Sequence, residues 1–175
     1  MILLDQDLDP GPAPASAARP AIAARRALPR STRLPSARSL SRFLREAQLE
    51  AKLRGKVTVL LTTDKTVRRL NRQFRGIDKA TDVLSFPASN SRITGVAGDL
   101  AISVPTASRQ AIEQGHSLAD EIKVLMLHGL LHLAGFDHEL DEGRMARRER
   151  LLRTRLGLPL GLIERSGLID PRARG

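Results

Sequence analysis

The sequence has no cysteine, tryptophan or tyrosine, and only four phenylalanines and four histidines among its 175 residues. Without cysteine, disulfides and thiolate metal sites are excluded, so any transition metal must bind nitrogen and oxygen ligands. So few aromatic rings leave little for a base-stacking platform, and a nucleic acid would be bound mainly through its phosphates. No apolar run approaches the roughly 18 residues of a membrane span, and the opening residues are acidic where a secretory signal is positive. We therefore expect a cytoplasmic protein with no membrane partner.

Positive charge is in excess, with a formal net charge of +10 at pH 7. Such an excess suggests a polyanionic partner. Much of it lies in one segment, because residues 10–45 contain eight arginines and no acid. Residues 46–175 carry 21 basic and 16 acidic residues, so most of the chain is only mildly basic.

The length of the chain suits one globular domain. Residues 10–38 hold six of the ten prolines and show no apolar periodicity, which indicates a flexible Ala/Pro/Arg-rich arm or insertion. The predicted organisation is an N-terminal edge strand over residues 1–9, this arm, a folded domain over residues 39–165, and a C-terminal tail over residues 166–175.

Hydrophobic spacing along the folded part switches between a period of two and a period of three to four residues, the patterns of strands and amphipathic helices. These patterns predict an α+β fold, with a small mixed sheet of about four strands covered by about five helices. Asp64 is expected to cap the second helix, and Ser117 the fourth. The predicted strands cover residues 1–4, 56–63, 83–87 and 98–103, and the predicted helices cover residues 39–53, 65–75, 105–114, 117–134 and 140–156.

Three of the four histidines fall within the stretch HGLLHLAGFDH, residues 128–138. His128 and His132 are four residues apart on a predicted helix, so their rings project from one face about 6 Å apart along the axis and can chelate one ion. Gly135 can adopt a positive φ and turn the chain, which allows His138 to return toward the pair. Three nitrogen ligands with one position left for water are the arrangement of a catalytic zinc, in a zincin-like site.

Two other interpretations of this cluster have to be weighed. A lone histidine on an apolar helix is more often a core residue, but three clustered ones would each need a partner, which a shared cation supplies. The same spacing occurs in zinc proteases, where the residue after the first histidine is a glutamate general base. Here that residue is Gly129, which disfavours peptide hydrolysis by that mechanism. His116 stands alone at a helix junction, and we expect it to be a surface or capping residue.

The histidine stretch resembles the HGxLHLxGYDH signature of the YbeY family of bacterial metal-dependent endoribonucleases, with Phe136 in place of a tyrosine. LNRQFRGIDKATDVLSFP at residues 70–87 resembles the family's LNxxYRxxxxPTDVLSF segment, with Phe74 and Ala80 replacing a tyrosine and a proline. GDLAIS at residues 98–103 is similar to its GDIxIS strand. Three separate motifs in the same order make this resemblance specific.

The resemblance implies one zinc ion held by His128, His132 and His138, and a functional arginine at Arg75. It also implies cleavage of single-stranded RNA, with roles in 16S rRNA 3′ end maturation and in ribosome quality control. The implied partners are small-subunit rRNA and the ribosome or its small-subunit proteins, and residues 39–165 would be the endoribonuclease domain. The residue chemistry fits, because zinc makes hydroxide available near neutral pH and a guanidinium fork matches phosphate oxygens.

Further candidates surround these residues. Asp137 is expected either to orient a ligand histidine or to cap the turn at Gly135. Arg68 and Arg72 precede Arg75 on one predicted helix, where they form either a groove for the RNA backbone or a solvated face.

The general base is not identified by the sequence, and Asp99, Asp137 and Glu121 are unranked candidates. Two alternative functions also stay open. A non-catalytic ribosome assembly factor with a structural zinc would hold its metal with four protein ligands. A metallohydrolase of peptides or small phosphoesters would need a base that the motif lacks.

Overall fold

A computed structural model of the protein describes residues 1–8, 33–89, 91–136 and 143–160. Within these ranges the chain forms four strands, five helices of eleven or more residues, and one single-turn helix. The strands are β1 (Ile2–Leu4), β2 (Lys56–Thr62), β3 (Val83–Pro87) and β4 (Val96–Ser103). The helices are α1 (Ala37–Ala51), α2 (Asp64–Arg75), α3 (Ser91–Thr94), α4 (Val104–Gln114), α5 (Leu118–Leu133) and α6 (Arg144–Arg155).

The predicted arm lies outside the described residues except for its last six positions, 33–38, and α1 already begins within these six. The predicted C-terminal tail over residues 166–175 also lies outside them. None of the helices in the described ranges is long and apolar enough to cross a membrane.

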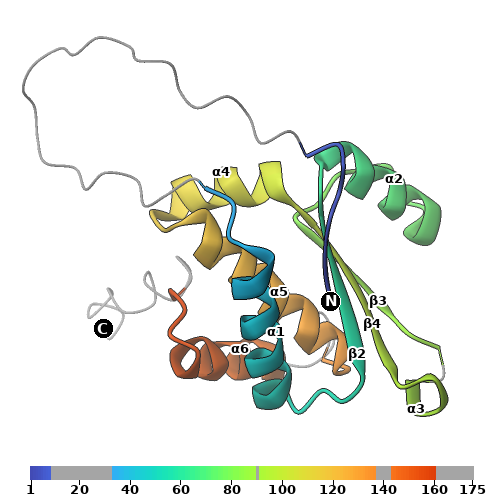
Figure 1. The fold of residues 1–175 in the computed structure, drawn as a ribbon, viewed down its shortest axis with the longest axis vertical. Coiled ribbons are helices and arrows are strands. Elements are labelled where there is room, and N and C mark those ends of the chain that lie inside the picture. The colour runs from blue at the N-terminus through green and yellow to red at the C-terminus, as the bar shows by residue number, and fades with distance from the viewer. Residues whose placement is uncertain (9–32, 90, 137–142, 161–175) are drawn as a thin grey trace, which may run out of the picture.

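The four strands form one mixed sheet in the order β1-β2-β4-β3 (Figure 1). β1 and β4 both run parallel to β2, whereas β3 pairs with β4 in the antiparallel sense and forms an edge. β1 forms the other edge, where the sequence predicted an edge strand. The predicted α+β class with a small mixed sheet is confirmed.

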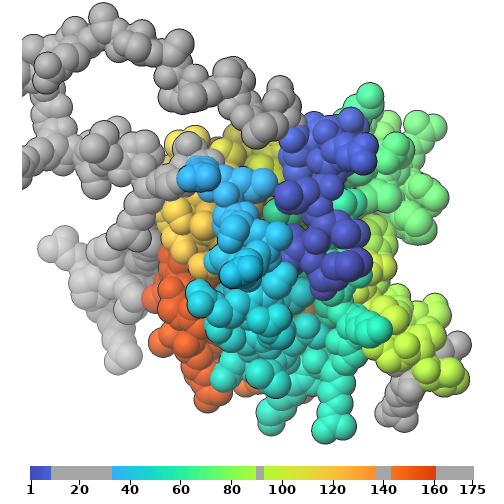
Figure 2. All heavy atoms as spheres, in the orientation of Figure 1, coloured from blue at the N-terminus to red at the C-terminus, as the bar shows by residue number. Residues whose placement is uncertain are grey.

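Helices cover the two faces of the sheet unequally. α1 and α5 pack on one face, with α4 and α6 against α5, whereas α2 packs on the other face (Figure 1). Figure 2 shows β1 and α1 side by side on the surface of the molecule. Inward-facing residues Val57, Val59 and Leu61 of β2 join the main core with α1 and α5. Only a small second core, formed by residues such as Val67, lies beneath α2.

The first helix packs as its sequence predicts. Its apolar residues recur every three to four positions, so they share one face and are buried together. Burying each large side chain of this kind contributes about 1.5–3 kcal/mol, and packing therefore holds α1 more than helix propensity does. The buried residues are Leu40, Phe43, Leu44, Ala47 and Ala51.

The central helix, α5, is buried on almost every side because it lies between the sheet and three other helices. This burial explains why its sequence is apolar nearly all round rather than along one stripe. The Ser117 hydroxyl accepts a hydrogen bond from the Asp120 amide at 3.0 Å, so the predicted cap is confirmed. The last two turns of α5 carry His128 and His132.

Two local predictions are wrong. Thr63, not Asp64, caps α2: Thr63 has the extended backbone that an N-cap requires, and its hydroxyl accepts from the Thr66 amide at 3.3 Å. His116 is not a surface residue, because it is only 8% exposed and pairs with the buried carboxylate of Glu121. A buried carboxylate needs such a partner, and the chain turn between α4 and α5 supplies it.

Candidate functional site

The end of α5 brings two imidazole rings together. The Nε2 atoms of His128 and His132 lie 3.2 Å apart, and the ring centroids are 4.8 Å apart with an interplanar angle of 71°. One helical turn separates the two residues, so their side chains share a face, as the sequence predicts. Two ring nitrogens that face each other at this distance are suited to share one cation.

A carboxylate from α6 fixes the first of these rings. Nδ1 of His128 lies 3.0 Å from Oε2 of Glu149, whose other oxygen accepts a hydrogen bond from Arg153. Burial would raise the pKa of Glu149, but the hydrogen bond with His128 and the charge of Arg153 outweigh it, so this pKa is lowered. An ionised carboxylate only accepts hydrogen bonds, so Nδ1 of His128 carries the proton and a neutral ring keeps its Nε2 lone pair for His132 or a metal.

Sequence reasoning missed Glu149. One signal was present, because Glu149 is the only acidic residue in α6, which has six arginines. A single carboxylate retained among so many cations indicates a specific partner. The identity of that partner depends on the packing of α6 against α5, which the sequence does not reveal.

The histidine pair opens into a pocket of about 670 Å³ that Arg75 also lines. Arg75 is the last residue of α2, and its Nη2 atom donates a hydrogen bond to the backbone carbonyl of Ser85 on β3 at 3.4 Å. The hydroxyl of Ser85 in turn donates to the carbonyl of Gly129 on α5, also at 3.4 Å. Arg75 of α2 and the two histidines of α5 are therefore brought to one cavity, with Ser85 of β3 between them.

Gly129 lies where α5 packs most closely on the sheet. A Cβ atom there would be 2.7 Å from Cδ2 of Leu100 and 3.2 Å from Oγ of Ser85. Any larger side chain would collide with Leu100 of β4 and Ser85 of β3, where α5 contacts the sheet. The position that carries the base in zinc proteases is therefore too crowded for a carboxylate, which disfavours that rival interpretation further.

The turn after α5 has the geometry that the sequence predicts at its glycine. Gly135 has a φ of +88°, a backbone region that L side chains rarely adopt. The amide of Phe136 donates back to the carbonyl of Leu131 at 3.0 Å, so the chain reverses close to the pocket, which both Gly135 and Phe136 line. Asp137 and His138 follow immediately but lie outside the described residues, and their predicted roles stay predictions.

The predicted groove arginines lie away from this pocket. Arg68 forms two hydrogen bonds with the carboxylate of Asp78, at 2.7 and 2.9 Å, and does not line the pocket. Arg72 is exposed on the same helix and does not line the pocket either. Of the three candidate arginines, the structure brings only Arg75 to the histidines.

The acidic residues considered as general bases do not line the histidine pocket where the structure describes them. Glu121 is buried beside His116, and burial raises its pKa despite the hydrogen bond from that histidine. Asp99 lines a neighbouring pocket instead of the histidine pocket. Asp82, which was not among the candidate bases, does line the histidine pocket, but its oxygens accept hydrogen bonds from Val83 and Gln110. In the described part of the chain, no acid is thus left as an obvious base at the histidines.

The donor set fits zinc. Imidazole nitrogens are common zinc ligands, and a ligand histidine usually donates its other N–H to a carboxylate, as His128 does to Glu149. In the described ranges, no group of three His, Asp or Glu side chains is arranged to hold a metal. The predicted third ligand, His138, lies outside those ranges.

A family model and several known proteins similar to this chain carry the same description. The family model for Endoribonuclease YbeY matches residues 31–157. A protein of that name from Koribacter versatilis (strain Ellin345) is 55% identical over 131 residues, which cover 75% of this chain and 84% of the relative. Another, from Solibacter usitatus (strain Ellin6076), is 50% identical over 140 residues, which cover 80% and 90% of the two chains.

A solved structure is also similar. The solution structure of TM1509 from Thermotoga maritima superposes with a TM-score of 0.51 at 26% sequence identity, covering 81% of this chain and 95% of that chain. The matches therefore extend over most of the described domain, including the elements that carry Arg75, His128 and His132. This chain belongs to the YbeY family of endoribonucleases.

Proposed function

We propose that this protein is a zinc-dependent endoribonuclease that cleaves single-stranded RNA. The observation that carries the proposal is the pocket in which Arg75 is brought to the facing Nε2 atoms of His128 and His132. Such a pocket combines donors for a metal with a cation for a phosphate. The names of the similar proteins support RNA as the substrate.

The residues of the pocket have separable roles in this proposal. His128, His132 and His138 would hold the ion, and a bound zinc supplies a nucleophile from water near neutral pH and polarises a phosphoryl oxygen. Arg75 presents a planar guanidinium that suits two oxygens of the scissile phosphate. The hydrogen bond to Ser85 orients this guanidinium, and the Glu149 carboxylate orients the His128 ring.

A cellular role is part of this proposal. We place the protein in the cytoplasm, where it would take part in 16S rRNA 3′ end maturation and in ribosome quality control. Its partners would be small-subunit rRNA and the ribosome or its small-subunit proteins. The mildly basic character of residues 46–175 is compatible with such a polyanionic partner.

Cleavage of an end-labelled unstructured RNA by metal-free and zinc-reconstituted protein tests this proposal. We expect activity only after zinc is restored, no activity from His132→Ala, and weak activity from Arg75→Glu with zinc still bound. Zinc content measured on each variant separates loss of metal from loss of phosphate binding. Equal cleavage by the metal-free protein would overturn the zinc-dependent mechanism.

A further inference from the structure

A second pocket, of about 730 Å³, adjoins the histidine pocket. It lies over the sheet face that α2 covers only in part, and Leu60 and Ala101 of the sheet and Leu70 of α2 line it. The two pockets share three residues, Arg75, Ser85 and Pro87. A ligand held by Arg75 can therefore extend from one pocket into the other without leaving the surface.

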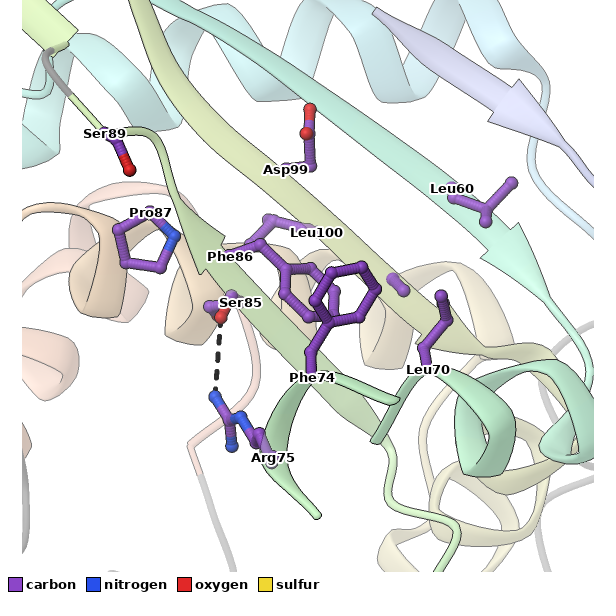
Figure 3. Close-up of a pocket in the computed structure, with 11 residues that line it drawn as sticks. Leu60, Leu70, Phe74, Arg75, Ser85, Phe86, Pro87, Ser89, Asp99 and Leu100 are labelled. Atoms are coloured by element: carbon purple, nitrogen blue, oxygen red, sulfur yellow. Dashed lines mark hydrogen bonds between the residues drawn. The ribbon is translucent and has the colours of Figure 1, made fainter. Parts of the chain in front are cut away.

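Two aromatic rings form one wall of the second pocket. Phe74 of α2 lies across Phe86 of β3, with centroids 5.2 Å apart and an interplanar angle of 64° (Figure 3). Phe74 is nevertheless 61% exposed, so its partner leaves much of the ring open. The small number of aromatic residues leaves little for a base-stacking platform. The fold instead places two of the four phenylalanines together, next to Arg75.

An acidic and a basic side chain, Asp99 and Arg75, line this pocket together with the rings. Asp99 is directly opposite Phe86 in the register of β3 and β4, so both side chains stand on the same face, and Asp99 is exposed there. Its carboxylate would repel a phosphate but can accept a hydrogen bond from a base, since each of the four RNA bases carries an N–H donor. Arg75, which also lines the histidine pocket, is positively charged and attracts a phosphate instead.

From this arrangement we infer that the second pocket binds an unpaired nucleobase of the RNA, the one next to the phosphate held at Arg75. Stacking on Phe74 provides the binding, and the Asp99 carboxylate faces the hydrogen-bonding edge of the base. A base within a duplex has both faces covered by its neighbours, so only a single strand can place one here. This inference rests on the proposed ribonuclease function and gives it a physical basis for strand selection.

A tryptophan at position 74 tests the inference directly. The natural chain contains no tryptophan and no tyrosine. The indole of Phe74→Trp is therefore the single fluorescent side chain of this kind, and its emission reports on this pocket. A second substitution, His132→Ala, keeps the RNA from being cleaved during the measurement. We expect a short uridine oligonucleotide to quench and shift the indole emission saturably. An oligomer of equal length made of abasic spacers should leave the emission unchanged, because it has phosphates but no bases.

Affinity measurements provide a second test of the inference. Stacking of one base on an aromatic side chain corresponds to about a 5-fold to 100-fold gain in affinity. Phe74→Ala and Phe74→Leu should both lose about this factor for the uridine oligonucleotide and nothing for the abasic oligomer, whereas Phe74→Tyr should keep the affinity. Leu49→Ala, at a 79% exposed residue of α1, is the matched control and should bind as the unchanged protein does.

The outcomes separate the two proposals. If the unchanged protein cleaves RNA while Phe74→Ala binds both oligomers normally, the base pocket is wrong and the ribonuclease function stands. If the protein neither binds nor cleaves RNA, both are wrong. A response of the indole to small-subunit ribosomal proteins but not to RNA would make this face a protein-docking surface and overturn the inference. Thermal melting of each variant confirms that it is folded.

Discussion

Glu149 of α6 accepts a hydrogen bond from Nδ1 of His128 on α5, at 3.0 Å, although 21 residues separate the two in sequence. This contact joins the two helices at the point where the chain presents its imidazole pair. Arg153, one turn further along α6, holds the other carboxylate oxygen, and both side chains of this ion pair are only 14% exposed. The ring of His128 is therefore positioned by a partly buried network rather than by its own helix alone.

Replacing Glu149 with glutamine should weaken zinc binding by about 10-fold to 100-fold, the usual effect of removing a carboxylate behind a ligand histidine. The reason is that an amide neither favours the Nδ1–H tautomer of His128 as strongly nor balances the charge of Arg153. Competition with a chromophoric chelator measures the affinity without any need for activity. Glu113→Gln, on the exposed face of α4, is the control. If Glu149→Gln bound zinc as tightly as Glu113→Gln does, Glu149 would have only a structural role.

Arg75→Lys should lower the rate of RNA cleavage by about 100-fold or more and leave zinc affinity unchanged. Lysine keeps the positive charge but loses the planar fork and the hydrogen bond to the Ser85 carbonyl. Single-turnover cleavage, with zinc content determined on the same sample, separates these effects. Arg45→Lys, on the exposed side of α1, should cleave normally. Full activity of Arg75→Lys would mean that charge alone suffices at this position.

Local patterns in the sequence predicted much of the fold and part of the site. The buried face of α1 follows from the spacing of Leu40, Phe43 and Leu44, and the proximity of His128 and His132 follows from the helical repeat. Both relationships are set within four residues of chain. Helical geometry alone therefore determines them, whatever the rest of the protein does.

The relationships that the sequence did not predict depend on how separate elements pack against each other. Glu149 meets His128 only because α6 packs against α5. Phe74 meets Phe86 only because α2 lies over β3, and His116 is buried only because the turn after α4 faces the start of α5. Periodicity reports which face of an element is apolar, but it does not report which other element covers that face.

The carboxylate of Asp64 illustrates this point and makes stability depend on pH. It accepts hydrogen bonds from Thr106 at 2.6 Å and Arg109 at 3.1 Å, and from Ser103, so it ties the start of α2 to α4. Burial would raise its pKa, but these hydrogen bonds outweigh it, so the pKa lies below the ordinary value of 3.8.

Because the folded state lowers this pKa, the Asp64 carboxylate stabilises the fold above the ordinary value, and this contribution is lost as the pH falls through the lowered one. Asp64→Asn should therefore be less stable than the unchanged protein at pH 6, and the difference should shrink below about pH 4. Urea unfolding of both proteins across this range measures the effect. A difference that stays constant with pH would show that the ionised form of Asp64 is not what stabilises the contact.

Gly129→Glu introduces the residue that zinc proteases use as their base. The packing of α5 predicts that this substitution will disrupt the fold instead of creating a protease. A side chain at this position meets Leu100 and Ser85 at the helix-sheet contact, so the added carboxylate would be buried without a partner. We expect a loss of more than about 3 kcal/mol in the free energy of unfolding, measured with urea. Gln73→Glu, on the exposed face of α2, should cost little. A stable Gly129→Glu variant that hydrolyses casein would show that the site can direct its chemistry at peptides, and that the glycine is what commits it to another substrate.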